Sequence, residues 1–190
     1  TPVNDPPEFT LLPAVTVEED AGLRSVSNFA SNIRRGPLGA TDEDAQQITF
    51  DVVADNPSAF IVQPVIAVDG TLSFQTALNA NSANANFGFS VRLRDNGLAA
   101  PPPNNNISPA QSFVINVTPV NDPPVADAFT INGTEDSALT ISAASVLVGD
   151  LGGPTPDEFP QQVRMTQTES TTAKGGSVTA TFDTSDPTKI

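Results

Sequence analysis

The heptapeptide TPVNDPP occurs twice in this chain, at residues 1–7 and again at residues 118–124. A chance match of that length is not expected in 190 residues, and the two copies start 117 positions apart (118 − 1). Self-similarity at a fixed spacing is the signature of a structural unit that recurs along a chain. The heptapeptide therefore predicts a boundary between two copies of one fold, residues 1–119 and residues 120–190.

Further matches follow the heptapeptide in the same order in both halves. VEEDA at 17–21 is answered by GTEDS at 133–137, and the groups Gly36-Pro37, Asp42-Glu43 and Gln46-Gln47 are answered by Gly153-Pro154, Asp157-Glu158 and Gln161-Gln162. The second copy stops near the equivalent of residues 74–77, so we expect it to be incomplete. Because the chain starts at Thr and shows no signal peptide, it reads as an excerpt from a longer polypeptide.

The regular segments of the first copy have a period of two. Apolar and polar residues alternate in ITFDVV at 48–53, in FGFSVRLR at 87–94 and in QSFVINVT at 111–118. Strict alternation predicts strands with one buried face and one solvated face. Gly, Pro, Asn and Asp separate these segments, as in DNP at 55–57 and DNG at 95–97. Short strands with frequent turns favour an all-β sandwich over a helical fold.

Composition excludes several classes of function. The chain has 22 Asp and Glu against 8 Lys and Arg, a net charge of −14, which argues against nucleic acids and anionic membranes as partners. No run approaches the roughly 20 apolar residues of a membrane span. The sequence has no His and no Cys, so the commonest general base and the cysteine nucleophile are both missing. We therefore predict that the protein is not an enzyme.

Four motifs of the first copy resemble those of cadherin-like repeats, which occur in tandem in large bacterial surface and secreted proteins. They are VNDPPEF at 3–9, similar to the linker between repeats; VEEDA at 17–21, similar to an early Glu motif; ATDED at 40–44, similar to a D-x-D motif; and RDNG at 94–97, similar to a late Asp turn. Where the family has D-R-E, this sequence reads ALNAN at 77–81. The resemblance implies tandem seven-stranded Greek-key sandwiches of the immunoglobulin-like kind, the second one incomplete.

The resemblance also implies Ca²⁺ sites where two repeats meet, and Asp, Glu and Asn supply the hard oxygen ligands that Ca²⁺ prefers. In an extended D-x-D segment, alternate side chains point the same way, so Asp42 and Asp44 are expected to converge. The candidates at the upstream junction are Asn4, Asp5, Asp42, Asp44 and Asp95. The candidates at the internal junction are Glu19, Asn121, Asp122 and Asp157, with Glu158 as a further one. Neither junction has its full set of ligands in this sequence, so we expect weak binding, on the order of 10⁻⁴–10⁻³ M.

The function that these features favour is a structural and adhesive segment of a large extracellular bacterial protein. In this hypothesis each sandwich is a spacer, and the proline-rich linker, clamped by Ca²⁺, stiffens the array. Its expected partners are neighbouring repeats of the same chain, homotypic contacts, or surface glycans and proteins. Two alternatives stay open: a carbohydrate-binding accessory module of a secreted polysaccharide-degrading enzyme, and a fibre subunit whose second repeat is completed by strands from another chain.

Overall fold

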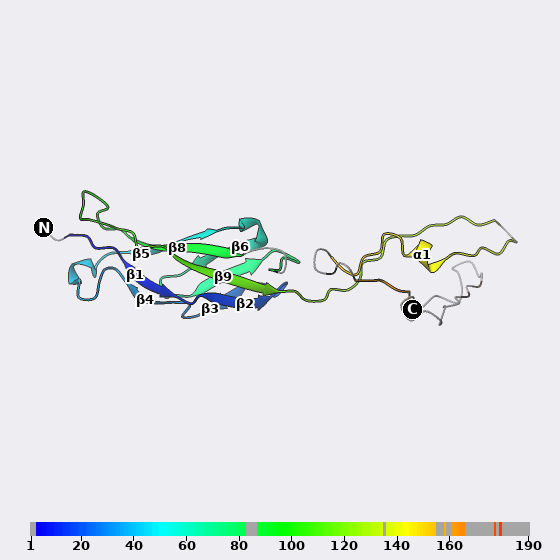
Figure 1. Ribbon diagram of the computed structural model, residues 1–190, viewed down its shortest axis with the longest axis horizontal. Coiled ribbons are helices and arrows are strands. Elements are labelled where there is room, and N and C mark those ends of the chain that lie inside the picture. Colours follow the sequence, from blue (N-terminus) through cyan, green and yellow to red (C-terminus); the bar gives the residue numbers. More distant parts are fainter. Residues whose placement is uncertain are drawn as a thin grey trace. The chain divides into compact units, whose positions relative to one another are not determined.

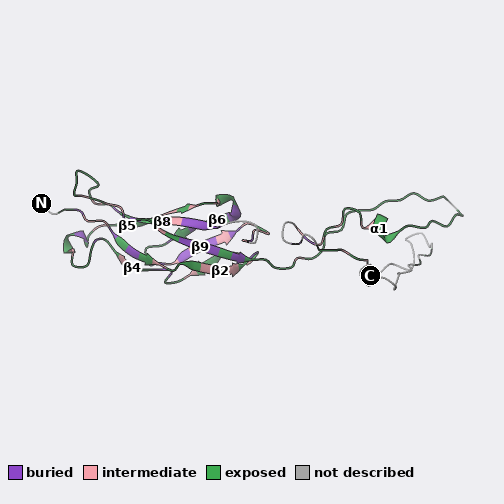
Figure 2. Cartoon of the chain, in the orientation of Figure 1, coloured by how far each residue is buried: buried purple, intermediate pink, exposed green. Residues whose placement is uncertain are grey.

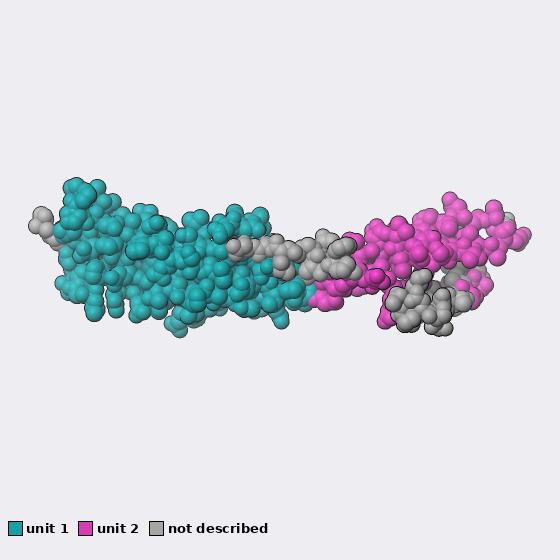
Figure 3. Space-filling view, in the orientation of Figure 1, with its two compact units in different colours: residues 1–120 teal, residues 121–190 magenta. Residues whose placement is uncertain are grey.

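The computed structural model describes residues 3–82, 87–134, 136–154, 158, 161–165, 177 and 179. The chain divides into two compact units, Thr1–Val120 (unit 1) and Asn121–Ile190 (unit 2), which are coloured separately in Figure 3. The division falls within the second copy of the repeated heptapeptide. Each unit is described below by itself.

Unit 1 is an all-β sandwich (Figure 1). Its strands are β1 (Glu8–Leu11), β2 (Ala14–Glu18), β3 (Arg24–Val26), β4 (Ala30–Arg34), β5 (Ile48–Ala54), β6 (Phe60–Ile66), β7 (Leu72–Thr76), β8 (Gly88–Asp95) and β9 (Gln111–Thr118). One sheet has the order β2-β9-β8-β5, a second has the order β3-β7-β6, and β1 pairs with β4. All of these pairings are antiparallel except β2 with β9, which is parallel.

The core of unit 1 follows directly from the alternation in the sequence. Phe89, Val91 and Leu93 of β8 are each 3% exposed or less, and the residues between them face outward or are half-buried (Figure 2). Phenylalanine rings fill the core: Phe29 lies edge-on to Phe113 at 4.8 Å between ring centroids, and Phe113 stacks on Phe89 at 4.7 Å. Phe60 of β6 lies edge-on to Phe89 at 5.4 Å and joins the two sheets. The prediction of an all-β fold is confirmed, and the three strands expected in the first copy from their period of two are β5, β8 and β9.

A tight turn at Asp69-Gly70 connects β6 to β7 and ties both strands to β4. Gly70 has a φ of 85°, a conformation that glycine adopts without steric cost, and its carbonyl accepts from the Ala30 N–H at 2.9 Å. The Asp69 carboxylate accepts from the Thr71 N–H at 2.9 Å. This backbone hydrogen bond, followed by one from the Thr71 hydroxyl, lowers the pKa of Asp69 below its ordinary value.

This shift gives a prediction for the acid side of the stability curve. Because the pKa of Asp69 is lower in the folded state, its contribution to stability is present above the ordinary Asp pKa and is lost as the pH falls through the folded pKa. Two-dimensional NMR titration of the carboxyl carbons should show Asp69 titrating below the ordinary range. Asp69→Asn should remove this part of the acid dependence, and titration of Asp69 at its ordinary value would contradict the prediction.

Unit 2 repeats, within itself, the first strand pairing of unit 1. Val125 and Leu151 form an antiparallel bridge, and the corresponding residues of unit 1, Glu8 and Arg34, pair in the same way 117 positions earlier (125 − 8 and 151 − 34). A short helix, α1 (Ala143–Val146), begins after Ser142, whose side chain accepts from the Ser145 N–H. In the described part of unit 2 no hydrophobic side chain is buried. Among the described residues, no helix is long and apolar enough to cross a membrane.

Candidate functional site

The linker that opens unit 1 is anchored by a buried glutamate. Glu43 ends the single-turn 3-10 helix η1 (Thr41–Glu43) and is only 2% exposed. Its Oε1 accepts from the Asp5 N–H at 3.0 Å, and its Oε2 contacts Nε2 of Gln46. The same Gln46 amide donates to Asn4 Oδ1 at 2.5 Å. One Glu-x-x-Gln pair therefore holds both the backbone of Asp5 and the side chain of Asn4.

Unit 2 builds the same anchor from the second copy of the motif. Glu158 is 3% exposed, and its Oε1 accepts from the Asp122 N–H at 2.9 Å. Gln161 contacts Glu158 Oε2 and donates to Asn121 Oδ1 at 3.1 Å. The recurrent Gly-Pro pair has a packing reason as well: a Cβ on Gly153 would lie 2.7 Å from Cγ of Glu158, and a Cβ on Gly36 would lie 2.9 Å from Cγ of Glu43. In both units glycine lets the backbone close over the buried glutamate.

In unit 1 the anchor extends to the end of β8 through Asn4. Asn4 is 6% exposed and donates through Nδ2 to Asp95 Oδ1 at 3.2 Å and to the Asn105 carbonyl at 2.8 Å. Asp95, itself 3% exposed, also accepts from the Gly97 N–H at 2.7 Å. The linker, η1 and the loop between β8 and β9 thus meet at a single polar cluster, defined here as Asn4, Glu43, Gln46 and Asp95.

The polar cluster holds more oxygen acceptors than donors. Asp95 Oδ2 and Gln46 Oε1 are buried without a hydrogen-bond partner. The two salt bridges among the described residues, Arg34–Glu8 and Arg94–Asp51, involve neither Glu43 nor Asp95. Buried carboxylates without a compensating positive charge are costly, so this cluster has the chemistry of a site for a hard cation.

The structure differs from the expectation for Asp42 and Asp44. The segment is not extended, because Thr41–Glu43 forms a 3-10 turn and Asp44 continues in the helical region with φ −58° and ψ −27°. Asp42 and Asp44 are therefore exposed, and the residue between them, Glu43, is the one that turns inward. Among the described residues, no group of three or more Asp, Glu, His or Cys side chains gathers as a metal site. Any cation in the polar cluster must therefore also use amide oxygens.

Glu19 forms a second anchor at the other end of unit 1. Its side chain is 3% exposed, with Oε1 accepting from the Val120 N–H at 2.7 Å and Oε2 accepting from Asn81 Nδ2 at 3.1 Å. The neighbouring Asp20 is exposed and accepts from the Asn79 N–H at 3.0 Å. Asn79 and Asn81 belong to the ALNAN segment. The side-chain amide of Asn81 therefore contacts Glu19 at the place where the D-R-E motif of cadherin-like repeats has carboxylates.

The remaining candidates are placed as follows. Asp5 is half-buried and is held by its backbone N–H. Asn121 and Asp122 belong to unit 2, where Gln161 and Glu158 hold them, and Asp157 lies outside the described residues. The role of these residues as metal ligands stays a prediction.

The residues that sequence reasoning did not assign in unit 1 are Glu43, Gln46 and Asn81. A signal for the first two was present, since Asp42-Glu43 and Gln46-Gln47 recur at Asp157-Glu158 and Gln161-Gln162. The family motif favoured the outer residues of Asp-Glu-Asp, whereas the 3-10 turn selects the middle one. Asn81 has no such signal, because its contact to Glu19 depends on the path of the chain after β7.

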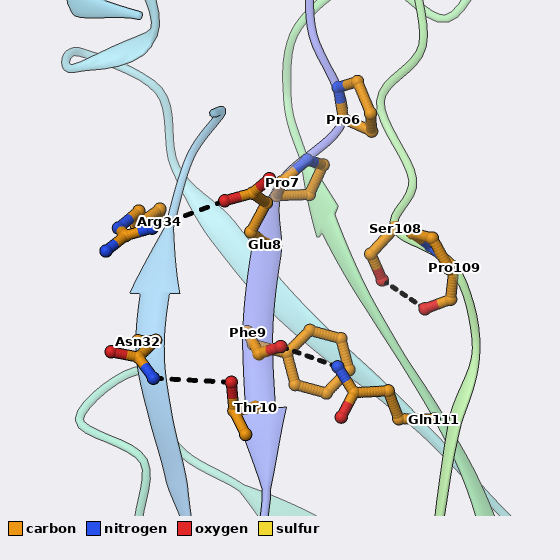
Figure 4. A pocket seen from close by; sticks show the side chains of 10 residues that line it. All are labelled: Pro6, Pro7, Glu8, Phe9, Thr10, Asn32, Arg34, Ser108, Pro109 and Gln111. Atoms are coloured by element: carbon orange, nitrogen blue, oxygen red, sulfur yellow. Dashed lines mark hydrogen bonds and ion pairs between the residues drawn. The ribbon is translucent and has the colours of Figure 1, made fainter. Parts of the chain in front are cut away.

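A separate groove crosses the outer face of β1 (Figure 4). It has a volume of about 540 Å³ and lies between side chains of β4 on one side and Ser108, Pro109 and Gln111 on the other. Gln111 forms part of its wall because the carboxamide donates to the Phe9 carbonyl at 2.6 Å and accepts from the Leu11 N–H at 3.3 Å. Phe9, the one aromatic residue lining the groove, is only 6% exposed.

Comparisons of the chain with protein-family models, with curated proteins and with solved structures returned no match.

Proposed function

We propose that this chain is a non-catalytic spacer segment of a tandem array, in which buried glutamates stiffen the linker between consecutive units. The supporting observation is the pair of anchors on neighbouring linker residues. Unit 1 holds the Val120 N–H with Glu19, and unit 2 holds the Asp122 N–H with Glu158. Only Asn121 separates the two anchored residues in the sequence.

The prolines of the linker also restrict its backbone. Pro119, Pro123 and Pro124 have restricted φ and no N–H to donate, so the backbone donors between them are those of residues 120–122. Two of these three donors are taken by buried carboxylates, which form stronger hydrogen bonds than neutral acceptors do. A segment restricted in this way suits a mechanical role in an extended protein outside the cell.

Removing either anchor should loosen the linker. The chain has no cysteine, so Ser112→Cys and Ser137→Cys, both at exposed positions, place one spin label on each unit. Pulsed electron paramagnetic resonance should give a narrow distance distribution for this parent. Glu19→Ala or Glu158→Ala should make it about twofold broader, because the freed segment then behaves as a flexible linker.

Glu18→Ala is the matched control, because Glu18 precedes Glu19 in the chain but is exposed. It should leave the distribution unchanged. A broad distribution in the parent, or the same broadening with Glu18→Ala, would refute the stiff-spacer function.

We further propose that a hard cation, with Ca²⁺ as the extracellular choice, occupies the polar cluster of unit 1. The orphaned Asp95 Oδ2 and the buried Glu43 carboxylate fit such an ion, and the amides of Asn4 and Gln46 each carry an oxygen that can join them. Asn4, Glu43, Gln46 and Asp95 are the residues that would hold it. The bound ion would supply the positive charge that the two carboxylates lack. Gln46 Nε2 contacts Glu43 Oε2 and Asn4 Oδ1 in the structure, so ion binding requires this amide to turn and present its Oε1 instead.

Calcium should raise the melting temperature of the chain. For a dissociation constant of about 1 mM, 10 mM Ca²⁺ should stabilise unit 1 by about 1.4 kcal/mol, or about 3–6 °C. Differential scanning calorimetry with and without CaCl₂ measures this shift. Glu43→Gln should abolish it, whereas Asp42→Asn, one position earlier and exposed, should retain it. A parent chain whose melting temperature does not respond to Ca²⁺ would contradict a cation in this cluster. So would an Asp42→Asn variant that loses the response.

A further inference from the structure

Strand β4 contains a β-bulge that turns polar side chains toward the groove of Figure 4. Its register with β1 shifts next to Asn32, and Asn32 has a φ of 51°, in the left-handed region. In an uninterrupted strand, side chains alternate between the two faces, so Asn32 would point inward behind the exposed Ser31. With the bulge, Asn32 and Arg34 are both exposed and Ile33 is half-buried between them. Asparagine adopts the left-handed region more readily than most residues other than glycine, so it suits the turned position of this bulge.

The side chains turned outward by the bulge meet those of β1 through weak contacts (Figure 4). Asn32 Nδ2 donates to Thr10 Oγ1 at 3.4 Å, and Arg34 Nη1 lies 3.5 Å from Glu8 Oε2. Both distances are at the long limit for hydrogen bonds, so a ligand hydroxyl can replace either contact without breaking a strong bond. The groove thus presents polar side chains that are held in place by weak contacts and can still form stronger hydrogen bonds with a ligand.

The opposite wall is rigid and partly apolar. Pro109 lies on this side beside Gln111, which is fixed by its two hydrogen bonds to the backbone of β1. Pro6 lies on the segment that leads into β1, and Pro7 beside it is buried. The groove carries no net charge, because Arg34 faces Glu8 and the other lining side chains are neutral. The groove therefore offers amide, hydroxyl and paired charged side chains next to proline rings. A ligand with hydroxyl groups on its edge and C–H groups on its face matches these two kinds of surface.

We propose that this groove binds a neutral saccharide, which would add an adhesive function to the spacer function. Asn32 and Arg34 donate to sugar hydroxyls, Glu8 and Thr10 accept from them, and the rings of Pro6 and Pro109 contact the C–H face of the sugar ring. The site lies on the side of unit 1 and uses none of the linker-anchoring residues. Its failure would therefore leave the stiff-spacer function untouched.

The test is an NMR titration of the ¹⁵N-labelled full chain with cellobiose, maltose and diacetylchitobiose. Small exposed sites bind in the millimolar range, so each sugar is added up to about 20 mM. At least one disaccharide should shift the amide resonances of β1 and of residues 31–34. Asn32→Gly should weaken its binding about two- to tenfold, because the loss of one hydrogen bond between neutral groups removes a factor of that size. Glycine accepts a φ of 51°, so this variant keeps the bulge.

Two matched controls make the result specific. Asn28→Gly changes another exposed asparagine in the left-handed region, with φ 56°, that does not line the groove. Arg94→Gln is the control for Arg34→Gln. Each variant removes an exposed arginine that forms an ion pair, with Asp51 outside the groove for Arg94 and with Glu8 inside the groove for Arg34. Both controls should bind the sugar as the parent does. No shift with any of the three disaccharides, or equal weakening in the controls, would overturn the proposal.

Discussion

Replacing Phe113 by alanine should remove a large part of the stability of unit 1. Phe113 is 2% exposed and packs in the core, edge-on to Phe29 and stacked on Phe89. Truncating a buried phenylalanine loses its transfer free energy and leaves a cavity, which together cost about 3–5 kcal/mol. The free energy of unfolding of a small domain is only about 5–15 kcal/mol in total, so the melting temperature should fall by about 15–25 °C.

The chain has no Trp and no Tyr, so far-ultraviolet circular dichroism is the probe for this unfolding. Val114→Ala is the control on the same strand, because Val114 faces outward and is 36% exposed. It should cost less than about 1 kcal/mol. A similar loss for both variants would mean that the inward face of β9 does not form the core.

How far the sequence predicts the fold depends on how regular each strand is. β8 and β9 alternate strictly, and both were predicted from that pattern within one or two residues of their bounds. β4 and β6 could not be found in this way, since the bulge at Asn32 and the register shifts around Val62 break the period of two. Irregular edge strands are set by their neighbours in the sheet rather than by their own pattern.

The candidate site shows a similar limit at the scale of a single turn. The repeated motif around Asp42-Glu43 pointed to the correct segment, but an assumed extended backbone favoured the wrong face of it. A single 3-10 turn reverses which residue is buried, and sequence spacing alone does not distinguish the two conformations. Glu19 was chosen from its motif, whereas its partner Asn81 is 62 positions away and could come only from the folded chain.

Gly97→Ala should detach the linker from unit 1. A Cβ at this position would overlap the side-chain amide of Asn4 and lie 2.7 Å from Gln46 Nε2, so Asn4 must leave its buried place. Asp95 and Asn105 then lose their hydrogen bonds to Asn4, and the carboxylate of Asp95 remains buried with fewer donors. Losing charged hydrogen bonds from a buried cluster costs about 2–4 kcal/mol, which urea unfolding followed by circular dichroism would measure.

A double-mutant cycle separates this overlap from a general effect of alanine. If the added methyl group acts through Asn4, Gly97→Ala should cost much less in an Asn4→Ala background than in the parent, with a coupling energy of about 1–3 kcal/mol. Gly133→Ala, where a Cβ would meet only Leu139 Cδ2 at an ordinary 3.7 Å, should be nearly neutral. Additive costs in the cycle would show that Gly97 is needed for its own backbone. A positive coupling would instead show that glycine is required there because the linker asparagine packs directly against it, so that the first residues of the unit are part of its folded structure.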